Sequence, residues 1–278
     1  MTTDVDLHMH TTISDGRLRP AELVALLARR GLRYAAITDH DCTDGLDEAF
    51  DTVKAFPELE LVTGVELSTD IPGSEVHVLG YFFDYHNDEL QVKLAEFRES
   101  RSGRAKKMLQ KLAALGMPLA WDRVVEIAGD GAIGRPHIAQ AMLEKGYIAS
   151  SQEAFTKYLG RTGLAYVERE KLTPAEAVQL IVRVGGRAVL AHPGDLPDPE
   201  PVLLELKAAG LSGMEVYYGS YGPEKVESLL AICQRHRLIP CGGSDFHGIG
   251  NDYEGEPGTV GPPVESLKML ADLASARA

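Results

Sequence analysis

The sequence is short of cysteine, of basic residues and of long hydrophobic stretches. Its three cysteines, Cys42, Cys233 and Cys241, lie far apart and form no C-x-x-C pair, which argues against a disulfide framework and a thiolate zinc site. No apolar stretch approaches the ~20 residues that a membrane-spanning helix needs. The N-terminus lacks a basic patch followed by an apolar segment, so we expect no secretory signal and a cytoplasmic protein.

The shortage of basic residues gives a formal net charge of -13 at pH 7. A protein of that charge repels the phosphate backbone at long range, so neither duplex nucleic acid nor a membrane is the expected partner. A small phosphorylated substrate remains possible, because bound divalent ions can dominate the local charge. The sequence leaves the oligomeric state open.

Short β-branched stretches alternate with helical patterns in the first and last thirds of the chain. The expected strands are residues 5–10, 34–40, 59–68, 76–83, 187–192, 213–217 and 239–245. Helices are expected at residues 20–30, 174–184, 199–209 and 223–237, several with a proline in the first turn. This alternation predicts parallel βαβ units, and hence an α/β sheet or barrel.

The rhythm changes between residues 90 and 167, where helical spacing dominates. We expect residues 93–167 to form a small inserted helical domain between two parts of one barrel, residues 1–92 and 168–278. An insertion that leaves a barrel from a loop and returns would cover the strand ends.

Histidines and acids stand at the ends of most expected strands. His8 and His10 are two apart, so they point to one side of their strand, and Asp15 follows in the next loop. His40 and His192 each end a strand. A single histidine of this kind is usually a hydrogen-bonded core residue, but strand ends of a parallel barrel gather on one face.

Four more residues complete this pattern. Glu66 is a lone carboxylate in an apolar stretch, and burying it would cost several kcal/mol without a paired cation. His77 lies between two valines, and Asp245 and His247 repeat the spacing of the first histidine pair. Together these residues predict a multinuclear metal site.

The motifs that contain these residues resemble the four motifs of the polymerase and histidinol phosphatase (PHP) family. They are Asp6-Leu-His-Met-His10 with Asp15, Thr38-Asp-His-Asp41, Glu66 with His77, and Ala191-His-Pro193 with Ser244-Asp-Phe-His247. The resemblance implies a distorted (β/α)7 barrel of the TIM type. It also implies three ions, held by His8, His10, Glu66 and Asp245, by Glu66, His77 and His192, and by Asp15, His40 and His247, with Asp39 orienting a histidine.

Imidazole and carboxylate ligands without thiolate suit Mn²⁺, which we expect, or Fe²⁺ or Zn²⁺. Three divalent ions against three carboxylates would leave a locally positive pocket, which favours a phosphate dianion.

The expected insertion contains Gly134-Arg-Pro-His137. Arg135 offers a planar fork for phosphate oxygens, and His137 can donate beside it, so both are predicted phosphate ligands. Pro136 also marks the start of a helix. Arg101 and Arg104, one turn apart, could meet a second phosphate, but we expect them on a solvated helix face.

The resemblance implies metal-assisted hydrolysis of a phosphomonoester, in which a water between two ions attacks phosphorus and Asp245 or His247 protonates the leaving group. Within the PHP family, the subgroup that has a helical insertion with such an Arg-x-His pair resembles phosphatases that remove the 3'-phosphate of 3',5'-nucleoside bisphosphates. Alternatives are a 5'-3' exonuclease on short RNA, a histidinol-phosphate-like phosphatase, an amidohydrolase, or a non-enzymatic module. Many amidohydrolases bridge two metals with a modified lysine at a strand end, and no lysine stands at these strand ends. A non-enzymatic module would have lost ligands, and no expected ligand is missing.

Overall fold

The computed structural model describes residues 3–71, 74–129, 131–168, 172–249 and 255–276. The strands in these ranges are β1 (Val5–Asp6), β2 (Tyr34–Ala36), β3 (Glu60–Val62), β4 (Gly64–Ile71), β5 (Ser74–Tyr81), β6 (Arg187–Leu190), β7 (Gly213–Tyr218) and β8 (Ile239–Gly243). They form a three-stranded sheet in the order β1-β2-β3 and a five-stranded sheet in the order β4-β5-β6-β7-β8.

The expected (β/α)7 barrel with parallel strands is only partly confirmed. The fold is α/β, but the strands of the described residues form two sheets with no closed barrel among them, and β5 runs antiparallel to both β4 and β6. Seven residues separate the expected strands 59–68 and 76–83, and a connection this short allows a hairpin but not a parallel crossover. The spacing itself therefore argued against an all-parallel arrangement.

Backbone hydrogen bonds connect the two sheets along the residues that follow their strands. The backbone N–H of His10 donates to the carbonyl of Phe246 at 2.8 Å, and that of Asp41 donates to Glu66 at 2.9 Å. Several expected strands are therefore shorter than predicted: His8, His10 and His40 lie just beyond β1 and β2, and Thr63 separates β3 from β4. The chain around His8, His10 and His40 thus leaves the regular ladders and forms isolated bridges, Met9 with Phe246 and His40 with Glu66.

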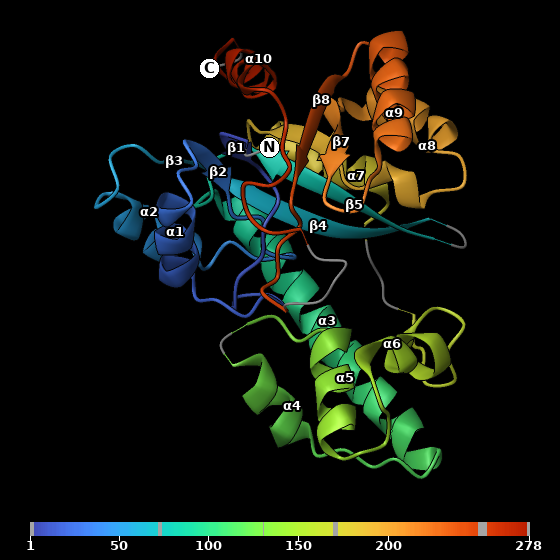
Figure 1. Ribbon diagram of the computed structural model, residues 1–278. Coiled ribbons are helices and arrows are strands. Elements are labelled where there is room, and N and C mark those ends of the chain that lie inside the picture. The colour runs from blue at the N-terminus through green and yellow to red at the C-terminus, as the bar shows by residue number, and fades with distance from the viewer. Residues whose placement is uncertain (1–2, 72–73, 130, 169–171, 250–254, 277–278) are drawn as a thin grey trace.

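The helices are α1 (Pro20–Arg29), α2 (Leu46–Val53), α3 (Asp88–Ala114), α4 (Trp121–Ala128), α5 (Arg135–Glu144), α6 (Ser151–Ala154), α7 (Pro174–Arg183), α8 (Glu200–Ala209), α9 (Pro223–His236) and α10 (Val264–Ser275). A proline in the first turn begins α1, α5, α7, α8 and α9, because its fixed φ suits that position. Figure 1 shows α1 and α2 beside the smaller sheet, α7, α8 and α9 beside the larger one, and α3 to α6 below both. None of the described helices is both long and apolar enough to cross a membrane.

Helix α3 connects the sheets with the lower helices. Its first turns place Leu90, Leu94 and Phe97 in the hydrophobic core around β4 and β5. Further along, Met108 and Leu112 pack in a second core that contains residues of α4, α5 and α6. The division of the chain at residues 92/93 and 167/168 remains a prediction, and α3 passes through the first of these boundaries without interruption.

Candidate metal and phosphate site

Glu66, on β4, lies at the centre of the candidate site with 1% of its side chain exposed. Five histidines contact its carboxylate: Oε2 lies 3.2 Å from Nε2 of His8, Nε2 of His10 and Nδ1 of His40, and Oε1 lies 2.8 Å from Nδ1 of His77 and 3.3 Å from Nε2 of His192. The burial that predicted a cation for Glu66 is present in the structure.

Two further carboxylates extend this cluster. Asp245 Oδ1 lies 3.3 Å from Nε2 of His8 and 3.1 Å from Nε2 of His10. Asp15 Oδ1 lies 3.3 Å from Nε2 of His247. The structure thus brings all nine expected metal-ligating residues into one cluster, from the ends of β1, β2, β6 and β8, from β4 and β5, and from the loop with Asp15.

The donor set suits cations. Among the described residues, the ligand atoms of three sets lie within 4.8 Å of one another: His10, Asp15, His40 and His247; His8, His10 and Glu66; and His40, Glu66 and His77. The sets overlap, so they form one continuous basin. Which residues bind which ion remains a prediction.

Hydrogen bonding provides a further test of this fit. His10 Nε2, His40 Nδ1 and Asp15 Oδ1 are buried, and their contacts with the charged neighbours named above lack the geometry of a hydrogen bond among the described residues. A buried polar atom without a hydrogen bond is costly, and metal coordination would satisfy each of these three atoms. The residues therefore fit a metal cluster.

Charge coupling in the cluster is strong. Burial opposes ionisation of Glu66, but His40, His8 and His77 outweigh it and hold the pKa of Glu66 well below its usual range. Burial also opposes the charged form of His247, but Asp15 and Asp245 raise its pKa to about 10. Without metal, protons thus supply part of the positive charge that these carboxylates need.

His40 differs from His247. Burial dominates its environment and lowers the pKa of His40 to about 3, although Glu66 and Asp15 act in the opposite direction. Its imidazole is neutral at physiological pH, which is the form that ligates metals.

The backbone is strained around the cluster. His192 has a φ of 28°, Asp245 of 55° and Asp41 of 52°, all in the left-handed region that residues other than glycine rarely adopt. Strained conformations of this kind concentrate at functional sites, where the surrounding structure enforces them.

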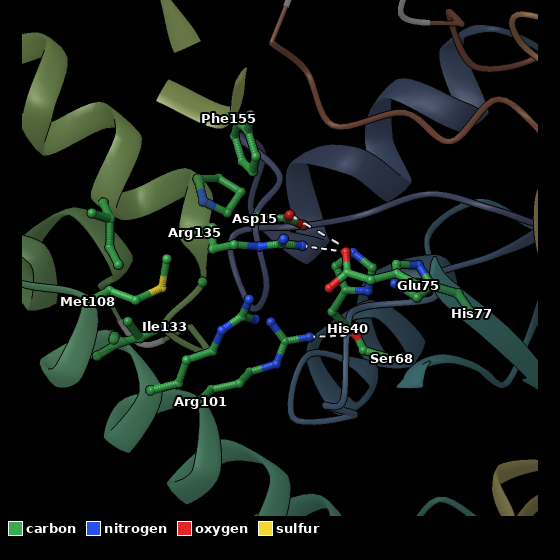
Figure 2. A pocket seen from close by; sticks show the side chains of 15 residues that line it. Asp15, His40, Ser68, Glu75, His77, Arg101, Met108, Ile133, Arg135 and Phe155 are labelled. Atoms are coloured by element: carbon green, nitrogen blue, oxygen red, sulfur yellow. Dashed lines mark hydrogen bonds and ion pairs between the residues drawn. The ribbon is translucent and has the colours of Figure 1, made fainter. Parts of the chain in front are cut away.

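A cavity of about 220 Å³ opens beside the cluster. Asp15, His40 and His77 lie on its strand side, whereas Arg101 and Arg135 lie on its helical side (Figure 2). Arg104, one turn along α3 from Arg101, also lines the cavity. Imidazoles and carboxylates therefore face guanidinium groups across one space.

The two predicted phosphate ligands lie in different places. Arg135 lines the cavity, where its Nη2 donates to Glu75 Oε2 at 2.5 Å and its guanidinium lies over the ring of Phe155 (Figure 2). His137 is not in the cavity lining; it is buried, and its Nδ1 accepts a hydrogen bond from the backbone N–H of Gly134 at 3.0 Å. In this structure His137 therefore caps the start of α5.

A model of the PHP domain family matches residues 6–168 of the chain. The chain belongs to the PHP domain family. Among relatives of this PHP protein, a 3',5'-nucleoside bisphosphate phosphatase from Chromobacterium violaceum is 34% identical over 252 residues, 89% of this chain and 88% of the relative. A 5'-3' exoribonuclease Rnm from Salmonella typhimurium is 35% identical over 247 residues, 87% of this chain and 84% of the relative.

The fold is also similar to that of solved PHP relatives. A protein from Bifidobacterium adolescentis, provisionally described as a metal-dependent phosphoesterase, matches with a TM-score of 0.88 and 31% identity. The match covers 97% of this chain and 96% of that one.

The prediction that Arg101 and Arg104 lie on a solvated helix face is wrong. Arg101 is 14% exposed; its Nε donates to Asp41 Oδ2 at 2.8 Å and its Nη2 donates to Ser68 Oγ at 2.7 Å. Arg104 donates to the carbonyl of Val167 at 2.8 Å. Helix α3 turns this face toward the strand ends, so both arginines line the cavity.

Asp39 was expected to orient a histidine; among the described residues its hydrogen bonds go to Thr11 and Ser14, and His10 interacts with its carboxylate electrostatically. Its carboxylate accepts hydrogen bonds from the backbone N–H and hydroxyl of Thr11 and from the hydroxyl of Ser14, which lies 3.4 Å from Nδ1 of His10. Asp39 therefore supports the loop after β1 and affects His10 through Ser14. Cys42 is buried outside the candidate ligand sets.

Sequence reasoning missed three residues that face the site. Glu215 is fully buried beside His8, Tyr218 donates to Asp245, and Glu75 pairs with Arg135. Glu215 carries the same signal as Glu66, a lone carboxylate in an apolar strand. Glu75 shares a strand face with His77, two residues away. No local pattern indicated Tyr218.

Proposed function

We propose that this PHP protein removes the 3'-phosphate of a 3',5'-nucleoside bisphosphate to give the nucleoside 5'-monophosphate and phosphate. It is a metal-dependent phosphoesterase, a hydrolase that acts on phosphoester bonds. The specific proposal is supported above all by one observation: a basin of imidazoles and carboxylates faces three arginines across a small cavity. Its relatives include a phosphatase named for this substrate.

Three divalent ions, with Mn²⁺ preferred, would be held by His8, His10, Asp15, His40, Glu66, His77, His192, Asp245 and His247. When bound, they would supply Lewis-acid chemistry to the phosphoryl group and its attacking water. The donor set of nitrogen and oxygen atoms also accepts Fe²⁺ or Zn²⁺.

The protein's own residues would position the phosphate. Arg135 presents a planar fork that matches phosphate oxygens, and Glu75 holds this fork at the cavity until an anion replaces the carboxylate. Arg101 is fixed by Asp41 and Ser68 and adds positive charge on the same side. We assign protonation of the leaving group to Asp245 or His247. His137 would act indirectly: its ring caps the first turn of α5, and this turn carries Arg135.

The cavity volume favours a small substrate. About 220 Å³ is below the ~300–1,000 Å³ of pockets that bury drug-sized ligands. Helices of the proposed insertion, residues 93–167, supply the arginines and Phe155, and would cover the metal basin. A nucleotide fits this description better than an extended chain.

A 5'-3' exoribonuclease acting on short RNA is the second candidate, because a relative of that name is as similar to this chain as the phosphatase is. A histidinol-phosphate-like phosphatase would use the same basin. An amidohydrolase is less favoured, because no lysine is among the residues that line the cavity in the described part of the chain.

A substrate panel tests the proposal. The protein, loaded with Mn²⁺, is given a 3',5'-bisphosphonucleoside, histidinol phosphate and a 5'-phosphorylated dinucleotide, and products are separated by chromatography. We expect the highest kcat/KM for the bisphosphonucleoside, with the nucleoside 5'-monophosphate as product. Faster cleavage of the internucleotide bond would overturn the assignment in favour of the exonuclease.

Metal analysis tests the cofactor proposal separately. We expect close to three transition-metal equivalents per chain after gentle purification, and loss of phosphate release after chelation with recovery on adding Mn²⁺. A protein that hydrolyses the panel equally well after complete metal removal would contradict the proposed site.

A further inference from the structure

Strand β7 contains an irregularity directly beneath the metal basin. Glu215 pairs with Cys241 of β8, but the next pair joins Tyr217 with Gly242, so Val216 is an extra residue in β7. This is a β-bulge, which bends a strand and changes where its side chains point.

The bulge changes which residues share a face. In a regular strand Glu215 and Tyr217 would point to the same side. Here Val216 and Tyr217 both belong to the hydrophobic core outside the sheet, whereas Glu215 and Tyr218 both contact the histidine cluster. The extra residue therefore places Tyr218, rather than Tyr217, on the basin side of β7.

Glu215 uses both of its oxygens there. Oε1 lies 3.0 Å from Nδ1 of His8, and Oε2 accepts a hydrogen bond from the backbone N–H of His192 at 2.8 Å. Glu215 and His8 are completely buried. Glu215 thus fixes the ring of His8, an expected ligand of one ion, and the backbone of His192, whose ring is an expected ligand of a second ion.

The contact with His192 has a particular value. The φ of His192 is 28°, so this residue needs outside support to keep its conformation. Glu215 supplies an acceptor for its N–H, while the imidazole Nε2 of His192 lies 3.3 Å from Glu66.

Tyr218 supports a different ligand, Asp245. Its hydroxyl donates to Asp245 Oδ2 at 2.6 Å, while Asp245 Oδ1 faces His8 and His10. One carboxylate oxygen is therefore held by the tyrosine and the other is left for the basin. Asp245 also has a left-handed φ, of 55°.

We infer that Glu215 and Tyr218 are positioning residues for the metal basin, with Glu215 orienting His8 and His192, and with Tyr218, which the bulge places on the basin side of β7, orienting Asp245. This inference rests on the proposed metal site. Residues that hold a ligating imidazole or carboxylate fix its tautomer and direction, and their loss commonly lowers metal affinity about 10- to 100-fold.

A carboxylate is required at position 215 because two donors face it. The amide of a Glu215→Gln variant has one acceptor oxygen and one donor nitrogen, so either His8 or the backbone of His192 would face an N–H group. If the amide nitrogen faces Nδ1 of His8, the ring must carry its proton on Nε2, the atom that points at Glu66. Either arrangement weakens the basin without changing its size.

The experiment compares metal binding in the wild-type protein and in three variants. Glu215→Gln, Tyr218→Phe and Tyr217→Phe are stripped of metal and titrated with Mn²⁺ by calorimetry, with the EPR spectrum of bound Mn²⁺ recorded at saturation. We expect Mn²⁺ affinity at one or more sites to fall about 10- to 100-fold in the first two variants, with an altered EPR spectrum. Tyr217→Phe is the matched control on the other face of the same strand and should bind Mn²⁺ as the wild type does.

The outcomes distinguish failure of the proposed function from failure of the inference on β7. If the wild type binds no Mn²⁺, the proposed function fails. If it binds Mn²⁺ and Tyr218→Phe has the affinity and spectrum of Tyr217→Phe, the inference on β7 fails. Thermal unfolding is recorded for each variant. A folded Glu215→Gln with wild-type Mn²⁺ affinity and spectrum overturns the role of Glu215, and if this variant does not fold, Glu215→Asp, which keeps the charge on a shorter side chain, replaces it in the same comparison.

Discussion

The strand wall and the helical wall of the cavity hold charge in different ways. On the strand wall, short imidazoles and carboxylates lie 2.8–3.3 Å apart around Glu66. On the helical wall, long arginine side chains reach the cavity from α3 and α5. Arg101 and Arg135 are restrained by carboxylates of the strand half, Asp41 and Glu75, and Arg104 by the carbonyl of Val167.

This difference indicates different tasks. Short side chains on strand ends have few rotatable bonds, so they keep the fixed geometry that metal ions need. A long guanidinium can exchange one anionic partner for another, which suits a group that binds and releases phosphate. We expect changes on the strand wall to abolish metal binding, and changes on the helical wall to alter substrate use with metal retained.

Replacing Glu66 by Gln should have the largest effect. The neutral amide cannot balance five neighbouring histidines and the bound cations, so we expect loss of metal and a fall in kcat/KM of about 10³-fold. Plasma emission spectroscopy and phosphate release measure the two effects. Glu60→Gln, at the exposed start of β3, is the control, and a Glu66→Gln variant with full metal content would break the distinction between the walls.

Replacing Arg135 by Ala should lower kcat/KM about 10²-fold, because the phosphate loses a charged two-pronged donor. Metal content should stay at the wild-type value, since Arg135 contacts Glu75 rather than the basin. Steady-state kinetics and metal analysis check both statements. Arg161→Ala is a matched control, because Arg161 forms a similar pair with Asp70 but does not line the cavity; equal losses in the two variants would refute the role of Arg135.

The metal-free strand wall should respond to pH. Burial opposes the charge of His192 and His247, yet neighbouring carboxylates raise the pKa of each to about 10, above the ~6.5 of an unfolded chain. Their contribution to stability is complete below about pH 6.5 and is lost as the pH rises through about 10.

The Tm of chelated protein should therefore fall between pH 7 and 10, by about 2–4 °C for each kcal/mol lost. Mn²⁺ should reduce this fall, because cations replace the protons in the basin. Differential scanning calorimetry with and without Mn²⁺ measures it, and a Tm that rises with pH in the chelated protein would contradict the charge arrangement.

Replacing Glu75 by Gln should have the smallest effect and the opposite direction. The carboxylate competes with phosphate for Arg135, so its loss should lower KM and strengthen inhibition by inorganic phosphate about two- to fivefold. Asp70→Asn, which breaks the pair with Arg161 away from the cavity, should leave both constants unchanged. A higher KM in Glu75→Gln would show that the carboxylate aids binding.

Local patterns in the sequence determined which residues form the basin. Strand alternation placed His8 and His10 on one side, and the cost of burying Glu66 indicated a cation before any contact was known. These inferences depend on the backbone within a few residues, where the chemistry of the chain decides the conformation. That all nine expected ligands meet depends in addition on the pairing of the strands that carry them, which brings distant segments together.

Contacts between distant segments decided the rest. Whether Arg101 faces water or Asp41 depends on how α3 packs against the strand ends, and helical spacing alone cannot distinguish the two faces. The pairing of β7 with β8 made Val216 an extra residue and so turned Tyr218 toward Asp245. Register and helix orientation are set by the partner that a segment meets, and the sequence of one segment does not contain that partner.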